Sequence, residues 1–258
     1  MHLFDRVNIY GDIASNHNGN PKVYDQLVRG IQDAGAIVKI QLYSPKTFDR
    51  DWDLPDRWVP SVFRLDDVDW AMANNPLALK IASVESTHYD LIHHCMGTGL
   101  PLLISTGGMT IDELMELCDI IDSYSGNVCL MHCVSMYPTP LSQANMIRIS
   151  VLADLMEDML LQPYVGWSSH HEPCPAMELL SVALAYDANQ IEFHVKLEVE
   201  DVSSPDEASA IPLEYLGEYR DRANWLAPAF GEAYDEDYIP QDRANVLEWR
   251  KRWQNKEV

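Results

Sequence analysis

Short apolar runs rich in β-branched residues recur along this 258-residue chain, and amphipathic stretches separate them. This alternation is typical of a parallel sheet whose strands are joined by helices. Seven runs are clear strand candidates, and an eighth lies in a stretch rich in Asp, Pro and Trp. The expected strands are residues 6–13, 37–42, 59–63, 78–82, 101–105, 128–132, 164–167 and 190–195.

The clearest helices are predicted over residues 21–34, 110–124 and 175–186. Pro21 suits the first turn of a helix, and Gly35 suits the position just after its end. Thr110 and Glu113 have the spacing of a capping box, in which each side chain bonds to the backbone of the other residue.

Polar residues end nearly every predicted strand. In a (β/α)₈ TIM barrel, ligand sites are built at this C-terminal rim. A doubly wound sheet of seven strands also binds ligands beyond its strand ends, but it does not need a polar group on every strand. We therefore expect an α/β barrel and keep the doubly wound sheet as the competing architecture. The polar strand-end residues are Asp12, Lys39, Gln41, Ser83, Ser105, His132, Ser168 and His194.

The charge balance narrows the classes of partner. Lys and Arg number 18 against 40 Asp and Glu, so the formal net charge is −22. Nucleic-acid binding needs clustered cations, and only residues 250–252 form such a cluster. We expect no nucleic-acid partner, whereas a small anionic substrate needs only a few local cations.

The N-terminal residues, the lengths of the apolar runs and the cysteines indicate where in the cell the protein is expected. The N-terminus lacks the apolar region of a signal peptide, and no apolar run approaches a membrane span. The five cysteines show no disulfide or C-x-x-C pattern and are expected to be reduced and mostly buried. We predict a cytoplasmic protein without a membrane partner, formed by one domain over residues 1–258 with an acidic, aromatic tail from about residue 231.

Two lysines lie inside predicted strands. Lys39 sits between Val38 and Ile40, and Lys80 follows Leu79 in a similar setting. Lys is rarely buried unpaired, so each position calls for an anion, either a carboxylate such as Asp12 or a ligand phosphate. For each lysine, two interpretations are left open: a structural ion pair or a contact to a bound anion.

Two histidines end neighbouring predicted strands. His170 follows residues 164–167, and His194 lies within residues 190–195. On adjacent barrel strands their imidazoles would come within reach of one divalent ion, with water and substrate completing the coordination. A buried structural histidine is the alternative for each.

Hydroxyl groups complete the set of polar residues at the strand ends. With Lys39 and Lys80 they would form a ring of donors suited to phosphate and carboxylate, although capping and turn hydrogen bonds are the simpler role for any one of them. The sequence contains no nucleophile elbow, P-loop or dinucleotide fingerprint. The hydroxyl residues are Ser83, Ser105, Thr106, Ser135 and Ser168.

As an ordered set, these motifs resemble the N-acetylneuraminate (sialic acid) synthase family from Asn8 to about Leu216. The most specific motif is His132-Cys-Val-Ser-Met-Tyr-Pro-Thr-Pro140. The resemblance implies a TIM barrel that joins phosphoenolpyruvate to an amino-sugar aldehyde and releases phosphate and a nonulosonate-type 2-keto acid. The other motifs are residues 12–19, 38–41, 80–85, 105–107 and 166–209.

The resemblance also implies roles for individual residues. His170 and His194 would hold manganese or magnesium, and Asp12 or Glu85 would handle protons. Tyr137 and Asp206 would lie with Glu85 on the sugar side. The implied phosphoenolpyruvate contacts are Lys39, Gln41, Lys80, Ser83, Ser105, Ser135 and Ser168.

The chain departs from the family pattern at several places. Asp12 stands where a glutamate is usual, Ser169 replaces an aspartate and Phe193 replaces a basic residue. Residues 41–63 are shorter than usual by about one helix, so one barrel strand is expected to be irregular or missing. We also expect the family's C-terminal antifreeze-like domain to be absent.

These departures keep other interpretations open. One is a non-catalytic relative that binds a phosphorylated metabolite or a partner subunit. Another is a metal-dependent enzyme of different chemistry on the same scaffold. The identity of the sugar and the formation of a homodimer are also left open.

Overall fold

Eight parallel strands close into a barrel in the computed structural model of the chain. β1 pairs with β2 on one side and with β8 on the other, which closes the eight strands into a cylinder. The doubly wound alternative is therefore wrong. The structure describes residues 3–44, 47–122, 124, 127–159, 161–198, 204–229 and 243–254, without the side chains of 253 and 254.

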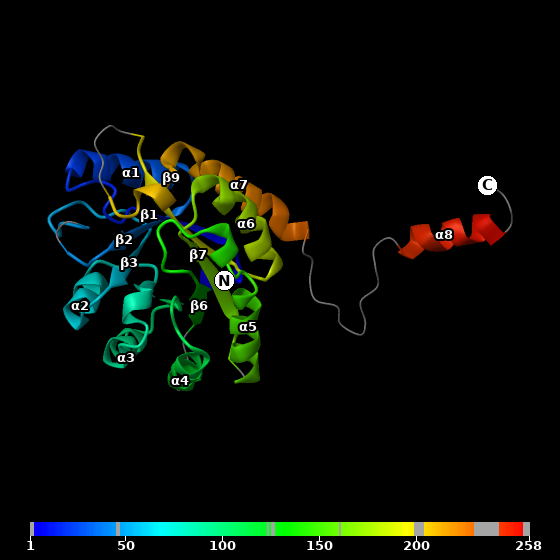
Figure 1. The fold of residues 1–258 in the computed structure, drawn as a ribbon, viewed down its shortest axis with the longest axis horizontal. Helices are drawn as coiled ribbons and strands as arrows, with labels where there is room; N and C mark the ends of the chain where they lie inside the picture. Colours follow the sequence, from blue (N-terminus) through cyan, green and yellow to red (C-terminus); the bar gives the residue numbers. More distant parts are fainter. Residues whose placement is uncertain are drawn as a thin grey trace.

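The strands follow the chain in simple order around the barrel (Figure 1). All eight predicted strands are confirmed, with ends that shift by one or two residues. A short additional strand, β9 (Ile211–Pro212), pairs with the end of β8. The barrel strands are β1 (Asn8–Asp12), β2 (Ile37–Gln41), β3 (Trp58–Val62), β4 (Leu79–Ile81), β5 (Leu102–Ser105), β6 (Val128–His132), β7 (Tyr164–Ser169) and β8 (Gln190–Lys196).

The inside of the barrel changes from apolar to polar along the strands. Near the N-terminal ends an apolar cluster fills it, with Phe4 among its members. Side chains on one face of a strand repeat every two residues, so the next inward layer lies two positions further on. In that layer Tyr10 is followed by Asp12, Ile37 by Lys39, Val59 by Ser61, Ala78 by Lys80, and Leu103 by Ser105.

Gly166 on β7 allows the interior to pack this closely. A Cβ atom added there would lie 2.5 Å from the carbonyl oxygen of Gln190 on β8 and 3.2 Å from Cγ of Met131 on β6. Any larger residue would push these strands apart.

Helices surround the strands, and the larger apolar core lies between the two layers. The three predicted helices are confirmed. Asn20 caps α1 by accepting the N–H of Lys22, and Thr110 and Glu113 form the expected reciprocal cap of α4. The helices are α1 (Pro21–Asp33), α2 (Leu65–Ala73), α3 (Tyr89–Gly97), α4 (Ile111–Asp122), α5 (Arg148–Asp158), α6 (Pro173–Ala185), α7 (Leu216–Leu226) and α8 (Arg243–Gln254).

The connection from β2 to β3 is short, as the sequence predicts. Its described residues, 42–44 and 47–57, form turns and no helix. β3 is nevertheless a regular five-residue strand paired with both neighbours, so the expectation of a missing or irregular strand is wrong. The sixteen positions between β2 and β3 are enough to return the chain for a parallel partner.

Residues 243–254 form a helix, α8, within the segment for which the sequence predicts only an acidic, aromatic tail. α8 stands away from the barrel in Figure 1. Of the aromatic residues in this region, Trp225 and Trp249 are exposed, while Phe230, Tyr234 and Tyr238 lie outside the described residues. None of the described helices combines the length and apolar character needed to cross a membrane.

Candidate functional site

A cavity of about 230 Å³ lies at the C-terminal ends of the barrel strands. All predicted site residues except Glu85 line it. The sequence therefore predicted nearly the whole polar lining. These residues are Asp12, Lys39, Gln41, Lys80, Ser83, Ser105, Ser135, Tyr137, Ser168, His170, His194 and Asp206.

Glu85 lies beside this cavity rather than in its lining. It ends a short 3₁₀ turn (Ser83–Glu85) that follows β4, and its Oε2 is 2.9 Å from Nδ1 of His88. Ser83 and Val84 of the same turn do line the cavity. Asp12 is thus the one of the two proposed proton-handling groups that faces the cavity.

Lys39 is held by two carboxylates. Its Nζ donates to Oδ2 of Asp12 at 2.7 Å and to Oε1 of Glu192 at 3.0 Å, and all three side chains are buried. Gln41 donates to the same Asp12 oxygen at 2.8 Å. The predicted carboxylate partner of Lys39 is confirmed, and Glu192 adds a second.

Lys80 has weaker compensation for its charge. Its Nζ donates to Oγ of Ser105 at 2.6 Å, while the nearest carboxylate oxygen, Oε2 of Glu192, is 3.7 Å away. Lys80 is therefore the cation in this cavity with the most to gain from an arriving anion.

Burial and charge act differently on the two lysines. Burial lowers the pKa of Lys39, but Asp12 and Glu192 outweigh it and hold that pKa above its usual value. For Lys80, burial dominates and the pKa lies below its usual value despite Glu192. Burial would raise the pKa of Glu192, yet Lys39, Lys80 and His194 together keep it below its usual value.

The two predicted metal ligands face each other across β7 and β8. Their ring centroids are 5.4 Å apart. Nδ1 of His170 is 2.7 Å from the carbonyl oxygen of Val134, which can only accept, so Nδ1 carries the proton and Nε2 is free to bind a metal. Burial, together with His194, lowers the pKa of His170 to about 3. The ring is thus neutral at physiological pH, as metal binding requires.

His194 supplies the second observation that fits a metal. Its Nδ1 is buried and has no hydrogen-bond partner among the described residues, with Oδ2 of Asp12 at 3.5 Å. The described residues contain no group of three His, Cys, Asp or Glu side chains placed around one metal position. The free Nε2 of His170 and the unpartnered Nδ1 of His194 are thus two imidazole donors, and a divalent ion held by them alone would leave its other positions to water or substrate.

Two polar groups of the site were not predicted. Glu192 lies two residues before His194 and therefore on the same face of β8. Its acidic side chain at this spacing in an apolar strand was the sequence feature that could have identified it as part of the site. Ser61 on β3 also lines the cavity, and its buried Oγ has no hydrogen-bond partner among the described residues. An unpaired buried hydroxyl facing a cavity is typical of a group that binds ligand.

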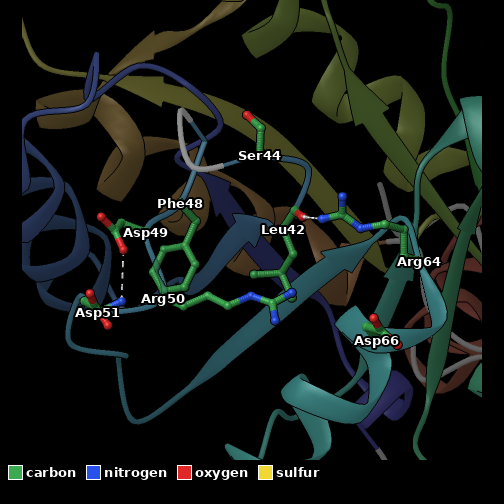
Figure 2. A pocket seen from close by; sticks show the side chains of 8 residues that line it. All are labelled: Leu42, Ser44, Phe48, Asp49, Arg50, Asp51, Arg64 and Asp66. Atoms are coloured by element: carbon green, nitrogen blue, oxygen red, sulfur yellow. Dashed lines mark hydrogen bonds between the residues drawn. The ribbon is translucent and has the colours of Figure 1, made fainter.

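A larger cavity, of about 600 Å³, is formed by the β2–β3 connection and the start of α2. Figure 2 shows the side chains that line it. Both of its cations are already held by the protein. Arg50 pairs with buried Asp67 at 2.6 Å, and Arg64 donates to the carbonyl oxygen of Leu42 at 3.5 Å. The histidines, lysines and unpaired hydroxyl all belong to the smaller cavity, and we assign the chemistry there.

Comparison with known proteins gives consistent results. A model of the NeuB family matches residues 57–234. An uncharacterized protein of Methanocaldococcus jannaschii is 26% identical over 92% of this chain and 75% of its own length. A pseudaminic acid synthase of Campylobacter jejuni is 25% identical over 81% of this chain and 70% of its own length.

A solved structure supports the fold. The N-acetylneuraminic acid (sialic acid) synthetase of Leptospira borgpetersenii superposes with a TM-score of 0.79 at 18% identity, covering 96% of this chain and 92% of that one. At this identity the likeness concerns the barrel alone.

Proposed function

The chain belongs to the NeuB family, and we propose that it condenses phosphoenolpyruvate with an amino-sugar aldehyde, giving a sialic-acid-like 2-keto acid and phosphate. One observation carries the proposal. Two buried lysines, two buried histidines and an unpaired serine hydroxyl line a single cavity in a chain of net charge −22. That lining suits a small, highly charged anion and a metal-dependent reaction.

Lys80 is the proposed anchor for the phosphate of the donor. It has one hydroxyl partner and a carboxylate oxygen at 3.7 Å, so a phosphate oxygen would satisfy a buried charge that the protein leaves undercompensated. Ser105 and Ser83 lie beside it in the lining and offer hydroxyl donors. Positioned donors of this kind also stabilise negative charge that develops as the phosphate leaves.

Lys39 and Ser168 orient the other end of the donor. Both donate to Oε1 of Glu192, at 3.0 Å and 2.9 Å, which fixes their side chains before any substrate arrives. Glu192 is a positioning residue in this scheme because its contacts are to the lysines and the serine. Pre-set side chains reduce the entropy lost when the substrate binds.

His170 and His194 would hold a divalent ion, manganese or magnesium, at the ends of β7 and β8. When bound, the ion would act as a Lewis acid toward the aldehyde oxygen of the sugar. C3 of phosphoenolpyruvate adds to the aldehyde carbon, water adds to C2, and the C2–O bond to phosphate breaks. Tyr137, whose ring centroid is 4.2 Å from that of His170, covers this side of the cavity.

Asp12 handles the proton of the attacking water in this proposal. Its Oδ1 accepts the N–H of Ala14 and its Oδ2 lies near both Lys39 and His194, so the carboxylate is fixed at the junction of the two halves of the site. Nε2 of Gln41 donates to the same oxygen, Oδ2.

Phosphate release tests the proposal. The protein is mixed with phosphoenolpyruvate, manganese and a panel of N-acetylated hexosamines, and inorganic phosphate is measured over time. We expect release that depends on both the sugar and the metal, and that Lys80→Met abolishes. Release that is independent of every sugar, or equal in Lys80→Met, would contradict it.

A further inference from the structure

A cavity of about 530 Å³ lies at the end of the barrel where the strands begin. Its lining includes Arg6, two residues before β1, Gly35, two residues before β2, and Arg57, directly before β3. The proposed catalytic cavity lies at the other end, where the strands finish, and the two cavities share no lining residue. This cavity is therefore separate from the site of the proposed reaction.

Three arginines from distant parts of the chain meet in this cavity. Arg6 and Arg57 come from the strand starts, and Arg220 comes from α7 in the outer layer. Among the described residues that line it, Asp5 is the only acidic one, and its carboxylate accepts the O–H of Tyr164 at 3.2 Å. The lining thus has an excess of positive charge in a chain of net charge −22. Such a local excess attracts anions.

The protein holds Arg220 in place by itself. Nη1 of Arg220 donates to the carbonyl oxygen of Ala34, and its Nε and Nη2 donate to Oδ1 of Asp221. Gly35 leaves room for this side chain, because a Cβ atom at position 35 would collide with Nη1 of Arg220. Gly35 also has a φ of +71°, which residues with a side chain rarely adopt. The guanidinium group of Arg220 therefore forms a fixed part of the cavity wall.

The other two arginines have no partner for their charge within the described part of the chain. Arg6 and Arg57 are both exposed, and neither guanidinium group forms a hydrogen bond or ion pair with a described residue. A guanidinium group presents a planar set of N–H donors that matches the oxygens of a phosphate group. Two such groups beside the fixed Arg220 give the cavity the donors that an anion with several charges needs.

The size of the cavity indicates the kind of anion. Its volume falls in the range of small-molecule sites, roughly 300–1,000 Å³. Val7, Ile9 and Ile37 add an apolar part to the lining, against which the uncharged portion of a ligand can pack. A nucleic acid would need many phosphate contacts over a wider surface, and an acidic chain of this kind repels it. A small phosphorylated molecule fits both the volume and the charge.

We propose that this cavity is a second anion site, which binds a small molecule through a phosphate or pyrophosphate group. Arg6 and Arg57 donate to the phosphate oxygens, and Arg220 adds its positive charge from the wall. A ligand here does not displace one from the proposed catalytic cavity, because the two cavities lie at opposite ends of the barrel. The proposal does not depend on the reaction proposed above.

Calorimetric titration of the full chain with inorganic pyrophosphate, in metal-free buffer, tests the site. Arg6→Gln with Arg57→Gln should weaken pyrophosphate binding at least about tenfold, because two of the three cations are lost. Lys22→Gln with Arg29→Gln makes the same change in net charge at exposed positions of α1 and should leave the affinity unaltered. Circular dichroism checks that each variant is folded.

Lys80→Met distinguishes this site from the catalytic cavity, which pyrophosphate also has the charge to enter. Binding that depends on Arg6 and Arg57 should persist in Lys80→Met, so that failure of the donor site and failure of this site give different results. Inorganic phosphate and ADP are titrated in the same way. Tighter binding of ADP than of both inorganic ions would support a nucleotide ligand, and the reverse order would support an inorganic one.

Three results would overturn the proposal. The first is an equal affinity for pyrophosphate in the wild type and in the Arg6→Gln, Arg57→Gln variant. The second is an equal weakening in the α1 control, which would show an effect of net charge alone. The third is the loss of all pyrophosphate binding in Lys80→Met, which would place every bound ion in the catalytic cavity.

Discussion

Nζ of Lys39 lies 2.7 Å from Oδ2 of Asp12, although the two side chains come from different strands and both are buried. The pair joins β1 to β2 inside the barrel, and the same carboxylate also accepts from Gln41 and Ala14. With these partners, the Asp12 carboxylate stabilises the fold around the site in addition to its proposed role in the reaction.

Replacing Asp12 with Ala should lower the free energy of unfolding by about 3 kcal/mol, because Lys39 would lose its closest charge partner in a buried position. Urea denaturation of the metal-free protein measures this. Asp25→Ala, at an exposed position of α1, is the control and should change stability by less than about 0.5 kcal/mol. Equal stabilities for the two variants would refute the structural role of Asp12.

His170→Ala and His194→Ala should each remove stoichiometric manganese binding, since the structure offers only these two imidazoles at the proposed metal position within its described residues. Calorimetric titration with manganese measures the loss. His93→Ala removes an exposed histidine on α3 and should bind the ion as the wild type does. Undiminished manganese binding in both variants would show that His170 and His194 do not hold the ion.

Lys80→Met should weaken phosphoenolpyruvate binding by about 2–5 kcal/mol, because a buried cation is lost opposite the phosphate. Lys22→Met, an exposed change of the same type on α1, should leave the affinity unaltered. Both affinities are measured by calorimetry with the donor alone, so the result does not depend on the sugar. An affinity within threefold of the wild type would show that the donor binds elsewhere.

His17 should make stability depend on pH. Its Nδ1 accepts the N–H of Gly19 and its Nε2 donates to the carbonyl oxygen of Thr47, each at 3.0 Å, so the neutral ring ties the start of α1 to the β2–β3 connection. Burial lowers the pKa of His17 below its usual value of about 6.5. Between these two values the unfolded chain binds more protons, and stability falls as the pH drops.

The corresponding measurement is urea unfolding at pH 7.5 and at pH 5. Wild-type protein should lose more stability over this interval than His17→Gln, whose side chain does not titrate. Parallel losses would mean that the pKa of His17 does not differ between the folded and the unfolded chain.

Much of the fold could be predicted because the barrel is regular. Each strand is a short apolar run with flanking turns, and simple alternation along the strands predicts that Asp12, Lys39 and Ser105 point into the barrel. β3 was the least certain strand because Trp58, Pro60 and Ser61 obscure its pattern. β3 is stabilised by pairing with β2 and β4. Such contacts between residues distant in sequence cannot be recognised from the residues of the strand alone.

The site was predicted less completely than the fold. Lysines and histidines inside apolar strands are conspicuous in the sequence, whereas a glutamate at position 192 has the pattern of an ordinary exposed residue, and only its contacts with both lysines distinguish it. Ser61 gave no signal, since a serine in a strand is common and only its unpaired, buried hydroxyl distinguishes it. Glu85 matched a motif, yet its pairing with His88 depends on the turn after β4.

The mass of the product tests the central claim most directly. Phosphoenolpyruvate, manganese and an N-acetylated hexosamine are incubated with the protein, and the mixture is analysed by mass spectrometry. We expect a new acid whose mass equals that of the sugar plus the three-carbon pyruvate unit, formed together with one equivalent of phosphate. Bound phosphoenolpyruvate that is recovered unchanged with every sugar in the panel would contradict it, and would indicate a barrel that binds the donor without condensing it.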